Sequence, residues 1–349
     1  MLEIDQNIAM DIEQLTNGGF QPLNTFLNSE DLDSVLENMR LFNGKIWPIP
    51  IIFPKPNHQQ ITTDTTLLLK FMGQNFAKLE VSEIFEFNIN KLIKLFFDTE
   101  DVTHPGVFET KKLSNVFLTG KLSKFKKLSE ILSLVAKEPI EIKKIIRDKK
   151  WRKIVGFHTR NPPHRAHEFL HRKALEVSDG LLIHPVIGTK KKGDFSNMAI
   201  MNSYKIFIEK YLPTDRVILS PLLTYSRYGG PKEAVFTAII RRNYGCTHFI
   251  VGRDHTGVKN FYGKYDSQKI FTKLSDIGIK LIFFNEPYYC KKCNDVTTID
   301  YCEHDAHHHI EVSGTIIREA IKNKTKISDI YIRKEVLEEL QKIDSVFVS

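Results

Sequence analysis

From residue 151 onward, short apolar runs alternate with longer segments in which apolar residues recur at helical spacing. This alternation is typical of βαβ units, whose strands form a parallel sheet. We predict strands at 154–157, 181–187, 217–222, 248–251 and 279–284. We predict helices over 163–177, 197–212, 231–243 and 265–277. Polar motifs follow several of these strands directly, at the edge where open α/β sheets bind ligands.

The first part of the chain has a different pattern, with short strand candidates separated by turn residues. The predicted strands are 47–53 (interrupted by proline), 66–71, 76–81 and 84–87. The predicted helices are 31–39, 140–149 and one that begins near residue 11 and stops at a turn over 17–19. Residues 104–107, HPGV, are predicted to form a turn. This pattern indicates a separate, mainly β domain. We favour a structural role for this domain over RNA binding.

The strongest chemical pattern, HTRNPPHRAH over 158–167, follows the first predicted strand of the second half. Asn161 is predicted to cap the next helix, with the two prolines in its first turn. His164 and His167 then share one helix face, beside Arg160 and the positive end of the helix dipole. Such a junction is suited to a phosphate-like anion.

A second motif, GRDHTG over 252–257, follows another predicted strand. Gly252 lets the backbone approach a ligand closely, and Arg253 offers a planar fork of donors to an oxyanion. Three lysines at 190–192 either screen a polyphosphate or form a solvated loop, and the sequence leaves both readings open. Arg227 is a further candidate to face the ligand.

A third motif, VSGTIIREA, opens a helix near the C-terminus. Ser313 or Thr315 can cap this helix, and Gly314 exposes backbone N–H groups. Arg318 lies one turn into the helix, on the face of Thr315. On its own the motif fits an ordinary capped helix. The histidine pair elsewhere in the chain favours a functional role for it.

Four cysteines are present, and three of them lie within thirteen residues. Cys290 and Cys293 form a C-x2-C motif whose thiolates can share one metal ion. Cys302 and one of the histidines that follow complete a Cys3His set, which is typical of structural zinc. Cys246 is expected to be an isolated buried thiol.

The composition is that of an ordinary globular protein, with 349 residues, 42% of them hydrophobic and 26% charged. This length allows two or three domains. The net charge of +8 suits anionic ligands without indicating nucleic-acid binding. No membrane-spanning run and no signal peptide is evident, so we expect a cytoplasmic protein.

Several motifs resemble the ATP sulfurylase (sulfate adenylyltransferase) family. TRNPPHRAH is similar to the family's HxxH segment, and GRDHTG and VSGTIIR follow in the family's order. TNGGFQPLNTF, MRLFNGKIWPIPI and HPGV resemble its N-terminal PUA-like domain. The cysteine segment resembles the zinc-binding segment of some bacterial and archaeal members, which makes His304 the fourth ligand and His309 the alternative.

The resemblance implies a Rossmann-like nucleotidylyltransferase domain with a parallel sheet, of the α/β class, preceded by a mainly β, PUA-like N-terminal domain. The expected boundaries are 1–148 for the PUA-like domain, 149–312 for the catalytic domain and 313–349 for a small C-terminal helical region. A zinc-binding insert is expected at about 288–309 of the catalytic domain. The chain has no P-loop motif, so we expect no fused kinase domain.

The reaction that the resemblance implies joins MgATP and sulfate to give adenosine 5'-phosphosulfate and pyrophosphate, reversibly. A sulfate oxygen attacks the α-phosphorus directly, so catalysis consists of positioning and charge stabilisation. The implied catalytic residues are Thr159, Arg160, Asn161, His164 and His167. The implied sulfate-binding residues are His158, Arg160, Arg253 and Thr256. The implied nucleotide-binding residues are Asn161, His164, His167, Gly252, Arg253, Asp254, His255, Gly257, Ser313, Gly314 and Thr315.

The family also implies cofactors and partners. Structural Zn²⁺ and Mg²⁺ on the ATP phosphates are expected, together with a homodimer. A separate kinase, reductase or pyrophosphatase would act downstream, and neither a membrane nor a nucleic acid is an expected partner. The direction in which the cell runs the reaction stays open.

Four positions depart from the family's usual pattern, and two of them lie in YSRYGGP, where the family usually shows MRYAGP. His158 stands where glutamine is common, and Thr256 stands where alanine is common. Both lie in motifs implied to bind sulfate, so the identity of the oxyanion stays open. One alternative is a nucleotidylyltransferase that acts on another oxyanion or acceptor, and a second is an RNA-binding protein without catalytic activity.

Overall fold

The computed structural model describes residues 1–56, 60–252, 255, 258, 260–274, 276–323 and 325–348. The chain forms two compact units, neither of which is one continuous stretch of sequence. The first comprises Met1–Lys143, Leu223–Gly245 and Asp254–Ile279. The second comprises Lys144–Leu222, Cys246–Arg253 and Lys280–Ser349. No helix in these described ranges is long and apolar enough to cross a membrane.

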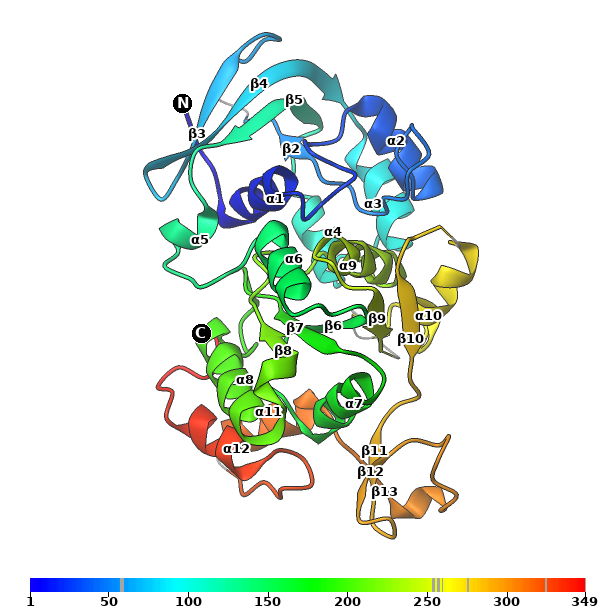
Figure 1. The fold of residues 1–349 in the computed structure, drawn as a ribbon. Coiled ribbons are helices and arrows are strands. Elements are labelled where there is room, and N and C mark those ends of the chain that lie inside the picture. The colour runs from blue at the N-terminus through cyan, green and yellow to red at the C-terminus, as the bar shows by residue number, and fades with distance from the viewer. Residues whose placement is uncertain are drawn as a thin grey trace. The chain divides into compact units, whose positions relative to one another are not determined.

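The first unit contains a five-stranded sheet, as far as its residues are described, with the order β1-β3-β4-β5-β2 (Figure 1). Its strands are β1 (Leu2–Glu3), β2 (Phe53–Pro54), β3 (Thr66–Phe71), β4 (Gln74–Glu86) and β5 (Val116–Lys124). The strands predicted at 76–81 and 84–87 form one strand, because a β-bulge between Val81 and Glu83 keeps both halves paired with β5. Of the strand predicted at 47–53, only its last residue pairs, because Pro48 and Pro50 cannot donate to a ladder.

Helices of the first unit are α1 (Gln6–Asn17), α2 (Ser29–Asn38), α3 (Ile89–Phe97), α4 (Pro105–Thr110), α5 (Leu128–Ile131), α9 (Pro231–Asn243), α10 (Asp266–Lys269) and η2 (Ile270–Lys273). The predicted stop of α1 is confirmed, since Gly18 adopts a left-handed conformation with φ 84°. The predicted turn at 104–107 is wrong. It is the start of α4, because the His104 side chain accepts from the Val107 N–H and Pro105 fits the first turn.

Aromatic rings form part of the core of the first unit. Phe20, Trp47 and Phe236 contact one another with centroid separations of 5.1–5.6 Å. Arg227 lies over the Phe20 and Phe236 rings and forms a buried ion pair with Asp11. The expectation that Arg227 faces the ligand is therefore wrong, because its charge is neutralised inside the core of this unit.

The second unit contains a parallel sheet with the order β10-β9-β6-β7-β8, five strands among its described residues (Figure 1). These strands are β6 (Ile154–Thr159), β7 (Gly180–Pro185), β8 (Val217–Leu219), β9 (His248–Val251) and β10 (Lys280–Phe283). Every ladder in it is parallel, so the predicted sheet is confirmed. The order reverses direction at β6, whose neighbours are β7 and β9, and this creates a topological switch point at the β6–β9 pair.

Helices of the second unit are α7 (Arg165–Glu176), α8 (Asn197–Tyr211), η1 (Thr214–Arg216), α11 (Gly314–Lys322) and α12 (Lys334–Gln341), with α6 (Pro139–Asp148) beginning in the first unit. One core joins apolar residues of α7, α8, α11 and α12 to alternate residues of β6, β7 and β9. Because alternate strand residues point to the same face, these four helices cover one face of the sheet (Figure 1).

The segment after β10 forms a small antiparallel sheet with the order β12-β11-β13, three strands in the part described. Its elements are β11 (Tyr288–Cys290), β12 (Asp295–Thr297), η3 (Ala306–His308) and β13 (His309–Glu311). Asn294 adopts φ 55° in the tight turn between the first two strands. This small sheet, with the residues between its strands, is called the knuckle below.

Candidate functional site

The site is built on the turn that follows β6, at the switch point of the sheet. The Thr159 hydroxyl donates to the Asn161 carbonyl and accepts from the Asn161 N–H, each over 3.1 Å. One side chain thus closes the turn on both sides and places Arg160 at its apex. This turn lies at the carboxyl end of a buried strand, where an anion can reach it.

Helix α7 starts later than the sequence suggested. Asn161 does not cap it, and the helix begins at Arg165 with His164 as its N-cap. The helix starts late because Asn161 and Pro162 each precede a proline, and a residue before proline avoids the helical conformation. Asn161 is therefore released from capping, and its side chain is available for other contacts.

His164 uses its side chain to cap the helix. Its Nδ1 accepts from the His167 backbone N–H over 3.4 Å. The neutral imidazole then carries its proton on Nε2, because the accepting nitrogen must be unprotonated. His164 and His167 stack with a centroid separation of 3.7 Å and an interplanar angle of 22°. The pair presents two neutral rings at the positive end of a helix, and His164 can donate through Nε2.

Burial keeps these histidines neutral. It lowers the pKa of His167 to about 4 and lowers the pKa of His164 well below its usual range. His171, one turn further along α7, is fully buried against Phe157, Tyr204 and Phe207. Its pKa is also well below the usual range because of burial, and neither ring nitrogen has a hydrogen-bond partner among the described residues. We infer that His171 costs stability in acid.

We expect His171→Leu to raise the free energy of unfolding more near pH 5 than near pH 7.5. An unfolded histidine binds a proton below about pH 6.5, whereas burial keeps His171 neutral in the folded protein. The unfolded state therefore binds more protons, and stability falls as the pH drops through that range. Removing the imidazole removes a loss of up to about 2 kcal/mol at pH 5. Urea unfolding of both proteins at the two pH values measures the difference.

The matched control for that measurement is His307→Leu, since His307 is exposed. Replacing an exposed side chain usually changes the free energy of unfolding by about 0.5 kcal/mol or less, so we expect only a small effect at either pH. A pH-independent effect of His171→Leu would contradict the argument.

Two residues that sequence analysis did not identify, Tyr204 and Glu168, support the pair formed by His164 and His167. The Tyr204 hydroxyl lies 3.4 Å from Nδ1 of His167 and also hydrogen-bonds with Thr159, which connects α7 to the end of β6. Tyr204 is fully buried on α8, and the helical spacing of that segment carries no signal for a polar contact with α7. The buried Glu168 carboxylate binds Arg333 through two bonds of 2.6 and 2.8 Å. Only the fold could reveal this partner, because the two lie 165 residues apart.

The start of α11 also reaches the turn after β6. Ser313 occupies the predicted N-cap position, but its side chain makes no capping bond. Gly314, the first residue of α11, lies close to the Asn161 amide, and Arg318 donates to the oxygen of that amide. The third motif and the first motif are thus brought together. Thr315 lies in the first turn of the same helix.

Positive charge is concentrated near the turn. Lys190 follows β7, is half-buried, and interacts electrostatically with Arg160. Burial lowers the pKa of Lys190 to about 8, Arg160 acts in the same direction, and Asp194 opposes them. The lysines at 191 and 192 are exposed. Of the two readings for this run, the charged ligand contact suits Lys190 and the solvated loop suits the other two.

The second motif is described only in part, since Arg253, Asp254, Thr256 and Gly257 lie outside the described residues. Gly252 follows β9 directly, and apart from Gly252 itself and its two chain neighbours no described atom lies within 4 Å of the position its Cβ would take, so a ligand has room there. In the first unit, the buried His255 ring bonds through Nε2 to the Thr237 hydroxyl over 2.8 Å. His158 alternates with Phe157 along β6 and so points to the sheet face opposite α7.

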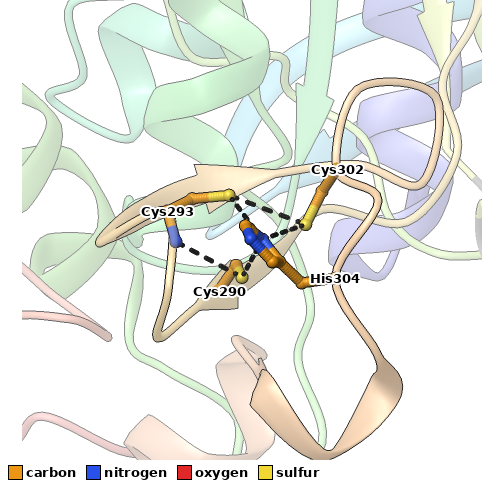
Figure 2. Close-up of side chains that lie close together, drawn as sticks. All are labelled: Cys290, Cys293, Cys302 and His304. Carbon is orange, nitrogen blue, oxygen red and sulfur yellow. Dashed lines mark hydrogen bonds between the residues drawn. The ribbon is translucent and has the colours of Figure 1, made fainter.

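The knuckle contains a cluster of possible metal ligands. Cys290, Cys293, Cys302 and His304 point toward one another, and their ligand atoms all lie within 4.8 Å of each other (Figure 2). Nδ1 of His304 lies 3.3–3.5 Å from the three sulfur atoms. The Cys293 and Cys302 sulfurs are 3.6 Å apart. Of the three sulfur atoms in the cluster, the His309 ring contacts that of Cys302, at 3.9 Å, and it stacks on Tyr288.

These separations fit one tetrahedral ion. Zn–S and Zn–N bonds of about 2.3 and 2.0 Å predict S–S and S–N edges of roughly 3.8 and 3.5 Å. The observed edges of 3.6 and 3.3–3.5 Å are close to these values. The cluster can therefore bind a metal. The remaining cysteine, Cys246, is buried, as predicted.

Comparison with known families assigns both parts of the chain. A model for the ATP-sulfurylase family matches residues 134–343, and a PUA-like domain model matches residues 1–127. The chain belongs to the ATP-sulfurylase family. The predicted family and the predicted fold class, an α/β domain preceded by a PUA-like domain, are confirmed for this chain.

Similar curated proteins share this assignment. A sulfate adenylyltransferase of Pyrococcus abyssi is 36% identical over 349 residues, which cover 99% of this chain and 91% of the relative. One from Chloroflexus aurantiacus is 38% identical and covers 97% of this chain and 90% of the relative. These relatives are nucleotidyltransferases, so the predicted enzyme class is confirmed.

Among solved structures, the chain resembles one described as a hexameric APS kinase from Thiobacillus denitrificans. The TM-score is 0.76 with 21% sequence identity, and the match covers 98% of this chain. It covers 62% of the other chain, so this protein spans less than two thirds of that structure. At this identity the likeness establishes the shared fold.

Proposed function

We propose that this protein catalyses the reversible reaction of MgATP with sulfate to give adenosine 5'-phosphosulfate and pyrophosphate. The observation that carries the proposal is the stacked pair His164–His167 at the start of α7, next to the Thr159–Asn161 turn. Neutral donors, a helix N-terminus and an arginine meet there at the switch point of a parallel sheet. That combination suits a polyphosphate whose bridging oxygen gains negative charge during reaction.

In the proposed reaction, a sulfate oxygen attacks the α-phosphorus in line with the bond to the departing pyrophosphate. The new O–P bond forms as the α–β bridge bond breaks, and the electron pair stays on pyrophosphate. Arg160 and Arg253 hold sulfate, with His158 and Thr256 beside it. Thr159 supports the α-phosphate, since its hydroxyl already fixes the turn. No nucleophilic side chain is required, so positioning and charge stabilisation supply the catalysis.

Asn161, His164 and His167 are assigned to the bridging oxygen and the departing pyrophosphate. His164 donates from Nε2, because Nδ1 is occupied by the cap bond. Lys190 adds positive charge near Arg160 and supports the same polyphosphate. Backbone groups of 252–257 and 313–315 bind the nucleotide, and the open position at Gly252 leaves space for it.

Two metal ions are assigned to different tasks. Zn²⁺ in the Cys3His cluster is structural, because four protein ligands leave no open position for a substrate. His304 is proposed as its fourth ligand. Mg²⁺ enters with ATP and neutralises charge on the phosphates.

We also infer a homodimer that works in the cytoplasm, with a separate enzyme consuming the phosphosulfate or the pyrophosphate. Light scattering after gel filtration tests the dimer directly. A monomeric mass would remove this part of the proposal and leave the reaction intact.

The reaction is tested by ATP formation from adenosine 5'-phosphosulfate, pyrophosphate and Mg²⁺, the direction in which a high-energy anhydride is consumed. We expect ATP to appear only when both substrates are present. If folded, zinc-loaded protein forms no ATP, the proposal fails. A screen of other oxyanions would then test the departures at His158 and Thr256.

A further inference from the structure

Arg318 contacts the turn after β6 from a helix that is distant in sequence. Its Nη2 donates to Oδ1 of Asn161 over 3.2 Å. A guanidinium carries hydrogen-bond donors and no acceptor, so the amide atom that faces it must be the oxygen. Because the amide is planar, its NH2 group is then directed away from Arg318. The contact therefore selects one of the two possible orientations of the Asn161 side chain.

The Arg318 side chain is itself held in place. Its guanidinium carbon lies 5.3 Å from the centroid of the Phe195 ring, which is fully buried. Phe195 packs in turn on Phe347, with a centroid separation of 5.0 Å. A guanidinium stacked on an aromatic ring loses less freedom when it forms a hydrogen bond. Asn161 thus meets a donor whose position is already fixed.

Gly314 makes this contact sterically possible. A Cβ atom at Gly314 would lie 3.1 Å from Cγ and 3.2 Å from Nδ2 of Asn161, which is closer than packed atoms normally approach. The backbone of Gly314 does not adopt a left-handed conformation, so its dihedral angles do not require glycine. The space occupied by the Asn161 amide is what excludes a side chain there.

We propose that Arg318 is a positioning residue, which fixes the Asn161 amide so that its NH2 group donates to the substrate phosphates. Gly314 leaves the space that this orientation needs. The inference rests on the proposed function and gives Arg318 an indirect role, exerted through Asn161. If the amide rotated, its oxygen would face the developing negative charge and repel it.

A double-mutant cycle tests this role, with kcat and KM for pyrophosphate measured during ATP formation. Arg318→Met keeps the length of the side chain and removes its donors. We expect it to lower kcat about 10-fold in the wild type, the effect of losing one charged hydrogen bond, with KM changed less. In an Asn161→Ala background, the same change is expected to cost less than about 2-fold, because the group on which Arg318 acts is gone.

Two results would contradict the proposal. If Arg318→Met costs the same factor in both backgrounds, or mainly raises KM for pyrophosphate, Arg318 binds substrate directly and the proposal is wrong. Arg318→Lys retains a charged donor and is expected to recover part of kcat, which a role in packing alone would not explain. Lys322→Met is the matched control, since it removes one positive charge from the same helix at an exposed position.

Gly314→Ala separates positioning from folding. Alanine favours a helix over glycine by about 1 kcal/mol, so this change is expected to maintain the melting temperature while it displaces the amide and lowers kcat. Unchanged kcat in a folded variant would overturn the proposal. An inactive wild type would instead reject the proposed function, so the two failures can be told apart.

Discussion

Replacing His164 with alanine is expected to lower kcat for ATP formation about 100- to 1000-fold, the usual cost of losing one donor to a developing charge. The capping bond to the His167 N–H leaves the proton of the neutral ring on Nε2. That N–H is the group we assign to the departing pyrophosphate, and alanine cannot replace it. Initial rates at saturating substrate measure the loss.

Alanine also removes the N-cap of α7, which by itself costs about 1 kcal/mol of stability. His164→Asn separates the two effects, because an asparagine oxygen can accept the same N–H while no ring remains. We expect it to melt near the wild-type temperature and still lose most of its activity. His307→Ala, at an exposed position, controls for the loss of a histidine. Activity near the wild-type level in His164→Asn would show that His164 serves only the fold.

Regular periodicity made the sheet of the second unit predictable. All five apolar runs became its strands, because a buried parallel strand needs apolar residues on both faces. The cysteine knuckle was equally readable, since C-x2-C spacing fixes which sulfurs can share an ion. In both cases local sequence determines the geometry, so little depends on the rest of the chain.

The wrong predictions of local structure arose where two local sequence preferences competed. Asn161 is a good capping residue, yet the two prolines that follow it delay the start of α7 to Arg165. His104 was read as part of a turn, yet its ring accepts a backbone N–H and starts a helix. In each case a histidine took a capping role that sequence preferences give to smaller side chains.

Other features depend on contacts between distant segments. Arg318 meets Asn161, 157 residues away, and Arg227 is neutralised by Asp11, 216 residues away. No periodicity or spacing encodes such pairs, because only the folded chain brings them together. The sequence therefore supplies the candidate groups of the proposed site, and the structure adds the contacts between distant segments that orient them.

Removing the proposed Zn²⁺ from the knuckle is expected to unfold the knuckle locally and to lower the melting temperature of the protein. A structural Zn²⁺ contributes on the order of 10 kcal/mol of binding free energy to the segment it closes. The described part of the knuckle has three very short strands around the ligand cluster. Chelation is therefore expected to expose residues near 286–311 to proteolysis. Zinc content by metal analysis and limited proteolysis before and after chelation measure both effects.

Substitutions decide which residues hold the ion. His304→Ala is expected to weaken zinc binding more than about 100-fold, since even neighbours that only orient a ligand cost 10- to 100-fold. His309→Ala is expected to cost about 10-fold or less, because His309 reaches a single sulfur and stacks on Tyr288. Cys246→Ser, a buried thiol outside the cluster, should leave zinc content unchanged. If His309→Ala weakened binding more than His304→Ala, His309 would be the fourth ligand, and the knuckle would have to rearrange to bring its ring to the other two sulfurs.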